Sequence, residues 1–286
     1  MVPAVPPAWK GEVVADVADD EALYLPDGDG YVATLLTQGA WNPDAQNGGA
    51  VLSLLGHRLE DVPTLAPMEI SRLTFDLMRP VPIGPRLDVR TRVVREGKKI
   101  QLVEVILSVG DVEHVRGQAL RLRVEDLTER PGLPEPTTTE DPADELARPE
   151  DVEPMYRERV AGVPGFLRGI ELRRAWKGQG PDGPFGYWVR LRVPVIAGAP
   201  VRATSRLAMA IDFANTIGVY VDPTSASTIN PDVSAHVLRP PTGEWLAIVG
   251  DTRFVHATGR GISTATISDL DGPVAFASTS QLVQPR

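Results

Sequence analysis

The chain has 286 residues, 42% of them hydrophobic, which is enough apolar material for one large domain or two smaller ones and excludes a disordered protein. Its net charge of -9 argues against a nucleic-acid partner, because binding to phosphates needs clustered lysines and arginines. The absence of cysteine excludes a disulfide framework, a thiolate nucleophile and a Cys-ligated metal.

The first residues of the sequence carry no targeting pattern. Residues 1–7 contain neither a charged stretch nor a long apolar run, so we expect no signal peptide. Nowhere do about 18 apolar residues follow one another, which is the length that a membrane-spanning helix needs. We therefore expect a cytoplasmic protein with no membrane partner.

The first half of the chain opens with an extended, proline-containing lead-in over residues 1–20, followed by a strand at 31–36. Turn-forming residues predict a loop at 37–49. Residues 50–60 then predict a helix with too many apolar positions for one narrow stripe, so we expect it to be deeply buried. Three or four antiparallel strands with period-two alternation follow, up to about residue 124.

The composition then changes, because proline, threonine, glutamate and aspartate dominate residues 125–164 and predict a linker on the surface. The second half repeats the order of the first. A strand is predicted at 186–193, a helix at 206–219, and further strands after Ile229.

Short segments also recur between the two halves. Residues 73–80 and 233–240 both end in Arg-Pro, and each opens the same series of strands. Ser108 and Ser268 stand at the same place before the turn that follows in each copy. The sequence therefore predicts a duplicated unit in which each copy reads strand, helix and several antiparallel strands.

This element order predicts an α+β fold, a tandem (double) hotdog, in which each half is an antiparallel sheet wrapped around a central helix. We expect an N-terminal hotdog over residues 1–125, a linker rich in proline and acidic residues over 126–164, and a C-terminal hotdog over 165–286. A duplicated unit of this kind usually forms a pseudo-symmetric pair with its functional site at the seam.

The first candidate site is Asn47-Gly48-Gly49 at the start of the first helix. A helix N-terminus presents unpaired N–H groups and a positive dipole, which suit an anion or a developing oxyanion. Glycines there let a substrate carbonyl approach the backbone. An ordinary N-cap followed by flexible glycines would give the same pattern, so the alternative stays open.

The second candidate is Asp212, which lies within the apolar run 207–214. A carboxylate in a buried helix costs several kcal/mol unless it is paired or functional. Such a group could be a general base or could orient a water. A buried aspartate that only binds neighbouring backbone is the alternative.

Two further polar groups lie on strands. If residues 228–232 are extended, Thr228, Asn230 and Asp232 share one face of a strand and could line a site. Gln281 lies in a strand of mostly small residues and by itself indicates little.

Well-known catalytic motifs do not occur in the sequence. We find no GxSxG nucleophile elbow, P-loop or HExxH motif. The four histidines are scattered and show no ligand spacing with the acidic residues. We therefore expect no metal and no cofactor.

Taken together, four segments resemble the acyl-CoA thioesterase II-like family, whose members are double-hotdog proteins. In the first copy these are residues 48–51 and 75–80, and in the second they are 207–213 and 277–281. The segment 207–213 is similar to the family segment that bears a catalytic aspartate, here Asp212. The segment 277–281 is similar to the one that ends in a catalytic glutamine, here Gln281.

The resemblance implies hydrolysis of acyl-CoA thioesters by an activated water, without a covalent acyl-enzyme. Asp212 would accept a proton from the water or orient it, and Gln281 would hold the water by a hydrogen bond. Backbone N–H groups near Gly48 and Gly49 would stabilise the oxyanion across the seam. The family also implies acyl-CoA as the substrate, a role in lipid metabolism and assembly into a homodimer.

The third member of the family's site is a threonine. Counting back from Arg239-Pro240 without gaps, its place falls on Asn230, whereas Thr228 would take it only with a two-residue shift. The sequence leaves open which of the two fills the role.

The sequence has features of two alternative functions. The loop 37–45 resembles that of hotdog enoyl-CoA hydratases, but Ala40 and Ala45 stand where that loop has its Asp and His, so the hydratase dyad is absent. The other alternative is a non-catalytic acyl-CoA or lipid-binding protein, or a repurposed hotdog that acts in a biosynthetic pathway. The substitution at Asn230 keeps this alternative open.

Overall fold

The structure is a computed structural model, and it describes residues 22–40, 42–132, 141–154, 165–175, 185–216 and 226–285. The expected lead-in over residues 1–20 and the end of the predicted helix 206–219 lie outside these ranges.

The first unit consists of one long helix and a set of antiparallel strands. The helix is α1 (Gly48–Glu60), preceded by the short 3-10 helix η1 (Leu35–Thr37). The strands are β1 (Tyr24–Asp27), β2 (Gly30–Ala33), β3 (Met68–Leu77), β4 (Arg86–Arg95), β5 (Ile100–Val109) and β6 (Val112–Arg123).

The second unit repeats this arrangement. Its helices are α2 (Gly165–Gly169) and α3 (Ala203–Asp212), with the 3-10 helices η2 (Pro142–Glu145), η3 (Pro149–Asp151), η4 (Phe213–Thr216) and η5 (His256–Thr258). Its strands are β7 (Ile170–Arg174), β8 (Phe185–Leu191), β9 (Ala226–Ile229), β10 (Asp232–Val237), β11 (Leu246–Val255), β12 (Arg260–Asp269) and β13 (Gly272–Pro285).

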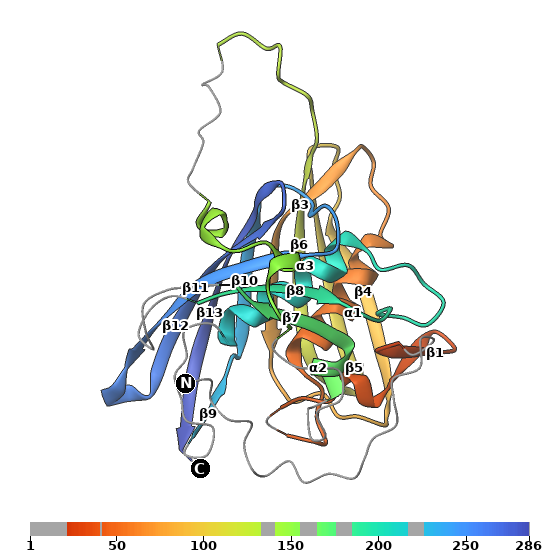
Figure 1. The fold of residues 1–286 in the computed structure, drawn as a ribbon. Helices are drawn as coiled ribbons and strands as arrows, with labels where there is room; N and C mark the ends of the chain where they lie inside the picture. The colour runs from red at the N-terminus through yellow and green to blue at the C-terminus, as the bar shows by residue number, and fades with distance from the viewer. Residues whose placement is uncertain are drawn as a thin grey trace.

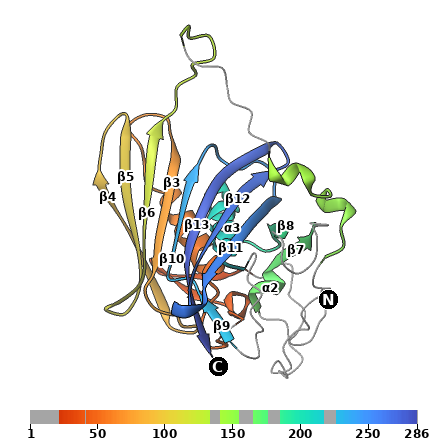
Figure 2. The ribbon, with the colours of Figure 1, turned by 90° about the vertical axis from the view of Figure 1, so that its left-hand side faces the viewer.

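Among the described residues, thirteen strands join in one sheet, in the order β1-β2-β4-β5-β6-β3-β10-β13-β12-β11-β8-β7, with β9 on β13. The seam between the units is the antiparallel pair β3–β10, in which Phe75 faces Val233. The N–H of Leu77 also donates to the carbonyl of Pro231 at 2.7 Å. Figure 2 shows the strands of both units side by side, with α3 behind them. The sheet is therefore continuous across the duplication.

Helices α1 and α3 lie side by side and run in opposite directions. Gly48 at the start of α1 contacts Asp212 at the end of α3, and Gly56 contacts Thr204 near the start of α3. A Cβ on Gly56 would lie 2.7 Å from the Thr204 carbonyl oxygen, so only glycine permits this close approach of the two helices. The helices occupy the centre of the molecule, between the strands of the two units (Figure 1).

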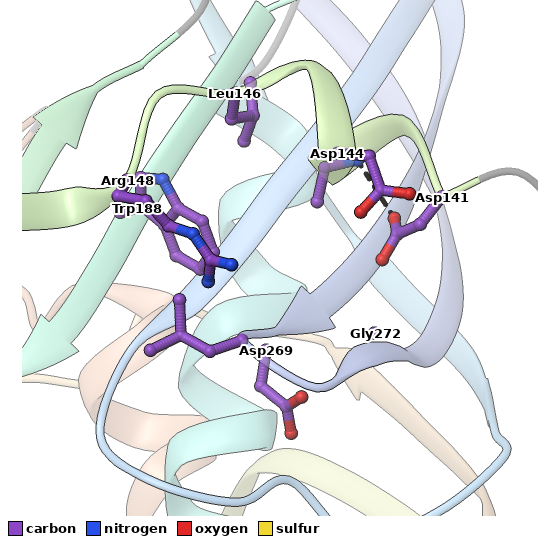
Figure 3. Close-up of a pocket in the computed structure, with 9 residues that line it drawn as sticks. Asp141, Asp144, Leu146, Arg148, Trp188, Asp269 and Gly272 are labelled. Carbon is purple, nitrogen blue, oxygen red and sulfur yellow. Dashed lines mark hydrogen bonds between the residues drawn. The ribbon is translucent and has the colours of Figure 1, made fainter.

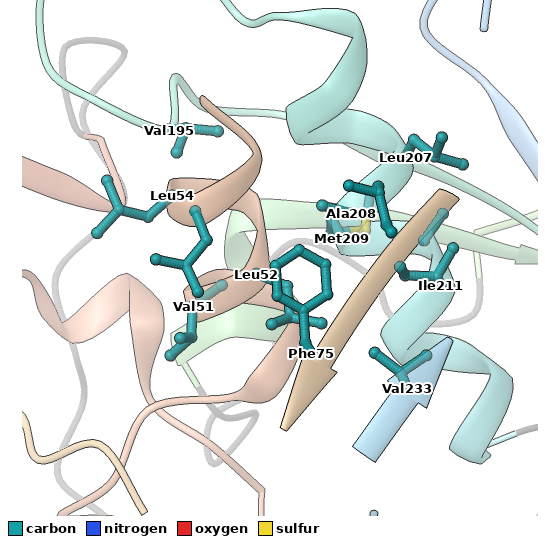
Figure 4. Close-up of a cluster of buried hydrophobic side chains, with 14 of the residues drawn as sticks. Val51, Leu52, Leu54, Phe75, Val195, Leu207, Ala208, Met209, Ile211 and Val233 are labelled. Carbon is teal, nitrogen blue, oxygen red and sulfur yellow. The ribbon is translucent and has the colours of Figure 1, made fainter. Parts of the chain in front are cut away.

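A single hydrophobic core joins the two units. α1 and α3 are buried along most of their length, which confirms the prediction of a deeply buried first helix. Phe75 from the first unit and Val233 from the second face the same apolar space (Figure 4). The core around them includes Leu52, Leu54, Leu207, Met209 and Ile211. Each helix packs on strands of its own unit and on the other helix.

The duplication is visible in the strand registers. In the hairpin β5–β6 the register shifts between Leu107 and Ser108, and in β12–β13 it shifts between Ile267 and Ser268. A β-bulge thus lies at the same place in both hairpins, although the shifts in β3–β6 and β4–β5 have no counterpart in the pairs β10–β13 and β11–β12. The prediction of a tandem hotdog is confirmed.

Several element boundaries differ from the prediction. α1 begins at Gly48 rather than at residue 50, because Asn47 caps the helix and accepts a hydrogen bond from the Gly49 N–H. The α-helical part of the second helix ends at Asp212 and continues as the 3-10 turn η4, so its last turn is tightened.

Part of the predicted linker packs on the second unit. Leu146 covers Gly186 of β8, and the indole N–H of Trp188 donates to the carbonyl of Ala147 at 2.8 Å. The hydroxyl of Ser268 donates to the buried carboxylate of Asp141 at 2.8 Å. Residues 141–147 therefore belong to the packed body of the second unit, whereas the described residues 126–132 are exposed. In the described ranges, no helix is both long enough and apolar enough to cross a membrane.

Candidate active site

Asp212 is the last residue of α3, at the point where α3 meets the N-terminus of α1. A Cβ on Gly48 would lie 2.5 Å from Asp212 Oδ1, which is closer than real Cβ atoms come. The antiparallel packing of the two helices therefore brings the carboxylate of one unit against the backbone of the other, and Gly48 is the residue that permits it.

Neutral hydrogen-bond donors surround this carboxylate. Asn230 Nδ2 donates to Asp212 Oδ1 at 2.8 Å. Burial raises the pKa of Asp212 to about 6, while the hydrogen bonds from Asn230 and from the Gly49 N–H act in the opposite direction. Burial disfavours the charged form of a carboxyl, whereas donors favour it. The balance leaves a carboxyl that changes its protonation state close to neutral pH, as a general base requires.

The N-terminus of α1 supplies backbone donors. The Gly49 N–H lies close to Asp212 and also donates to the side chain of Asn47 at 2.9 Å. Asn47 and Asp212 therefore already use the Gly49 N–H. The other N–H groups of a first helical turn have no carbonyl partner within the helix and could receive an incoming oxygen. A Cβ on Gly49 would lie 3.0 Å from the ring of Phe166, which stacks on Phe213 with 6.2 Å between ring centroids. An apolar wall therefore borders these donors.

Gln281 reaches the same region from β13 and is only 3% exposed. Its Nε2 donates to the backbone carbonyl of Asn215 at 3.2 Å and also to the hydroxyl of Ser263. Its Oε1 is buried and has no hydrogen-bond partner among the described residues. The orientation of the amide is fixed on its donor side, and an acceptor oxygen is left available.

The structure brings Asn230 to Asp212, and it places Thr228 on β9 opposite Val283 of β13. β9 ends at Ile229 and β10 begins at Asp232, so the chain is not one extended strand over 228–232. The interpretation that residues 228, 230 and 232 share one strand face is therefore wrong. Pro231 has no N–H for a strand ladder. β9 and β10 run in the same direction along β13, but from Ile229 to Ser234 the chain spends five residues against four on β13, so the alternation of faces is interrupted between them.

Asp232, singled out with these residues, has a different function in the structure. Its carboxylate accepts a hydrogen bond from the Ser280 N–H at 2.9 Å, and its carbonyl accepts one from the Thr279 hydroxyl at 2.6 Å. These bonds hold β10 against β13 beside Gln281, so Asp232 ties the two strands together.

The sequence analysis missed Asn215 in η4. This residue is 5% exposed, its Nδ2 donates to Asn230 Oδ1 at 3.2 Å, and its carbonyl accepts from Gln281. It connects the two polar groups to each other and hence to Asp212. A signal was present, because Asn215 follows Asp212 by one helical turn inside an apolar run.

Away from these residues the described part of the chain has a small pocket and no cluster of metal-ligating side chains. No group of three or more histidine, aspartate or glutamate side chains in the described ranges is placed to hold a metal. A small pocket lies elsewhere, between residues 141–148 and the second unit, lined by Asp141, Arg148, Trp188 and Asp269 (Figure 3). None of the predicted site residues lines this pocket.

Comparisons with known proteins give the same picture for both halves. Residues 37–122 match the family model of the acyl-CoA thioesterase N-terminal domain, and residues 142–283 match that of the acyl-CoA thioesterase C-terminal domain. A search of curated proteins with the sequence finds no match.

Solved structures with the same fold cover nearly the whole chain. A candidate thioesterase from Novosphingobium aromaticivorans is 22% identical, with a TM-score of 0.68 over 92% of this chain and 98% of its own. A hot dog fold protein of unknown function from Alicyclobacillus acidocaldarius is 15% identical, with a TM-score of 0.66 over 93% and 97%. The acyl-CoA thioesterase II TesB2 from Mycobacterium marinum is 13% identical, with a TM-score of 0.58 over 91% and 94%. At these identities the likeness shows a shared fold.

Proposed function

The chain belongs to the acyl-CoA thioesterase family, and on that premise we propose that it hydrolyses acyl-CoA thioesters to the free acid and CoA. The reaction uses an attacking water that Asp212 activates, and it forms no covalent acyl-enzyme. The products follow directly, because water adds its hydroxyl to the acyl carbon and its remaining proton to the sulfur.

The observation that carries this proposal is the meeting of Asp212 with the N-terminus of α1. The carboxylate comes from the second unit, and the glycines and N–H groups come from the first. A base with a pKa near neutrality beside a set of backbone donors is the combination that hydrolysis of a thioester needs. The apolar wall of Phe166 and Phe213 borders the same point and suits the acyl part of the substrate.

In the first step, Asp212 accepts a proton from the water as the water oxygen attacks the thioester carbon. Gln281 Oε1 accepts the second hydrogen of the water and fixes its direction, and Asn230 keeps the Asp212 carboxylate in place. The carbonyl oxygen becomes an oxyanion that N–H groups of the first turn of α1, beginning at Gly48, stabilise, while the Gly49 N–H stays with Asn47 and Asp212. The tetrahedral intermediate then collapses, the carbon–sulfur bond breaks, and the proton held by Asp212 passes to the leaving thiolate.

The backbone donors contribute as much to this scheme as the acid. One well-placed oxyanion donor is worth roughly 3–4 kcal/mol of transition-state stabilisation. General base catalysis contributes about 100- to 10,000-fold in rate. The seam between the units is therefore the catalytic element, and neither half contains the whole site.

The alternative function is binding of an acyl-CoA or another acyl thioester without turnover, or action on one specialised substrate in a biosynthetic pathway. The amide of Asn230 at the place of a threonine is the observation that favours it. A binding protein would retain CoA ligands without releasing thiol, and a specialised enzyme would leave ordinary acyl-CoAs intact. The expected homodimer is a separate prediction that sedimentation of the purified chain tests.

The test is the release of free thiol from a panel of acyl-CoAs, short to long, straight and aromatic, with the wild type and with Asp212→Asn. We expect turnover with some members of the panel. We expect a loss of at least about 100-fold in the variant, because the base is gone and the shape of the side chain is kept.

A folded Asp212→Asn variant with near wild-type turnover would show that Asp212 is not the base. A wild type that binds acyl-CoA, measured by calorimetry, but hydrolyses no member of the panel would favour the binding function instead.

A further inference from the structure

A carboxamide side chain can point either its oxygen or its NH2 group toward a neighbour, because the two ends have nearly the same shape. The proposed site depends on two such groups, Asn230 and Gln281. Each of these amides can serve the proposed hydrolysis in only one of its two orientations. Neighbouring groups must therefore fix the orientation of both.

For Asn230 that direction is held from two sides. Its Nδ2 donates to Asp212 Oδ1 at 2.8 Å, and its Oδ1 accepts from Asn215 Nδ2 at 3.2 Å. In the reversed orientation the amide oxygen would face the carboxylate and the NH2 group would face another NH2 group. Both contacts would then be repulsive, so Asn215 and Asp212 together select one orientation.

For Gln281 the orientation of the amide is held by the backbone of Asn215. Gln281 Nε2 donates to the Asn215 carbonyl at 3.2 Å and to the Ser263 hydroxyl. A carbonyl only accepts, so the reversed amide would place two acceptor oxygens against each other. Gln281 Oε1 is thereby left as the acceptor without a partner among the described residues.

We propose that Asn215 is a positioning residue for the hydrolysis: its side chain locks the Asn230 amide with the N–H toward Asp212, and its carbonyl locks the Gln281 amide with the oxygen free to accept from the attacking water. This inference rests on the proposed function for its chemistry. Its geometry, a chain of contacts from Asp212 through Asn230 and Asn215 to Gln281, stands independently.

The unsatisfied atoms at this place support a role beyond structure. Gln281 Oε1 and Asn215 Oδ1 are both buried, and neither has a hydrogen-bond partner among the described residues. Both are acceptors. Buried acceptors without partners are costly in a protein that only needs to fold, and a molecule that carries two donor hydrogens would satisfy them. Water is such a molecule and is the nucleophile of the proposed reaction.

The lock on Asn230 also affects the acidity of Asp212. Burial raises the pKa of Asp212, and two groups act against it: the Asn230 amide from the segment between β9 and β10, and the Gly49 N–H from α1. Neither group is charged. An Asn230 amide that is free to turn would lose its hydrogen bond to the carboxylate for part of the time. The pKa of Asp212 would then rise, since donors favour the charged form.

The experiment compares Asn215→Ala in the wild type with the same change in an Asn230→Thr background. A hydroxyl at position 230 rotates to donate to Asp212 and needs no partner to hold its direction. In the wild-type background we expect Asn215→Ala to lower kcat about 10- to 100-fold with KM changed less than about threefold. In the Asn230→Thr background we expect the same change to alter kcat less than about threefold, because the two residues act as one unit.

A second readout does not depend on turnover. The titration of the Asp212 carboxyl, followed by carbon-13 NMR and assigned by its loss in Asp212→Asn, should move upward by about half a pH unit or more in Asn215→Ala. The Asn230→Thr background should show no such shift. Asn215→Leu, which is similar in size, carries no donor and adds no charge, serves if the alanine variant does not fold, and we expect it to move the titration in the same direction.

An Asn215→Ala variant whose Asp212 titrates as in the wild type would overturn the positioning role, and so would an equal loss of kcat in both backgrounds. If the wild type hydrolyses no acyl-CoA, the proposed function fails. The titration still decides whether Asn215 holds Asn230.

Discussion

Asp212 gains its reactivity from neighbours that carry no charge. Its carboxyl is held by an amide and a backbone N–H, and burial raises its pKa to about 6 despite these donors. A lysine or arginine in the same place would stabilise the carboxylate and make it a poor base. Asp212 at the seam is therefore a carboxyl that readily accepts a proton, and its burial in the charged form lowers the stability of the folded protein.

This cost gives a pH-dependent prediction for stability. The folded protein binds the proton of Asp212 more tightly than the unfolded chain does, so the contribution of this group is fully present below about pH 4 and is lost as the pH rises through about 6. We expect Asp212→Asn to melt higher than the wild type at pH 8. We expect the difference to shrink toward zero as the pH falls to about 4. Thermal melts of both proteins across this range check it, and a difference that does not depend on pH would contradict the raised pKa.

At the scale of single residues, Asp212 and some of the groups around it could be predicted from the sequence. Asp212 was identified because a carboxylate in an apolar run needs a reason, and Gln281 was identified through a family resemblance. Asn215 was missed, and the choice between Asn230 and Thr228 stayed open. Both depend on how η4 and the irregular residues between β9 and β10 are placed in space, which no local pattern encodes.

At the scale of elements, the antiparallel contact of α1 and α3 determines the site. The order of strands and helices, the copies and the deep burial of α1 were all predictable, because periodicity and turn residues report them directly. The break between β9 and β10 was not predicted, although Pro231 is the kind of residue that ends a strand ladder. The meeting of the two helix ends across the seam was expected only through the family resemblance, whereas no local pattern predicts that β3 pairs with β10.

Two glycines of α1 should respond differently to the same substitution. Gly48→Ala places a methyl group 2.5 Å from Asp212 Oδ1 and displaces the carboxylate, so we expect turnover to fall about 100-fold with little loss of stability. Gly56→Ala places its methyl group 2.7 Å from the Thr204 carbonyl oxygen and forces α1 and α3 apart, which should cost about 1–3 kcal/mol of stability.

Thiol release and thermal melts on both variants give the comparison. A Gly48→Ala protein that is unstable but fully active per folded molecule would show that this glycine serves the fold and leaves the carboxylate undisturbed.

For the whole molecule, the two ends of the α1–α3 pair are related by the duplication but are used differently. Arg121 faces Gln101 in β5–β6, as Gln281 faces Gly261 in β12–β13. Arg121 is 5% exposed and donates to the carbonyls of Leu59 and Val62 at the C-terminus of α1. At the position where the second copy has a catalytic candidate, the first has a cation that caps a helix.

Glu60, the last residue of α1, is the counterpart of Asp212, the last residue of α3. Its carboxylate accepts from the Thr204 N–H at 2.8 Å, as Asp212 faces the Gly49 N–H at the other end. The two ends of α1 are about 18 Å apart, from the rise per residue of an α-helix, so a change at one end need not disturb the other.

We therefore expect Arg121→Met to lower stability and to spare turnover. The substitution leaves the buried carbonyls of Leu59 and Val62 without their donor, at a cost of about 2–3 kcal/mol. Gln281→Met, a change of similar size at the matching position, should lower turnover far more than it lowers the melting temperature. Denaturant unfolding and thiol release on the pair test this. An Arg121→Met protein that is fully stable, or one that loses turnover, would argue against the division of labour.

The shared bulges of β5–β6 and β12–β13 mark a duplication, and a duplication within one chain has an evolutionary consequence. Two identical chains in a symmetric dimer must carry every mutation at both of their equivalent sites, so neither site can change alone. Joining the copies in one chain removed that constraint, and each position could then be inherited separately. Selection for turnover can then act on the end of the α1–α3 pair that contains Asp212, and selection for stability can act on the end that contains Arg121. Gains at the second end can thus offset the buried acid at the first.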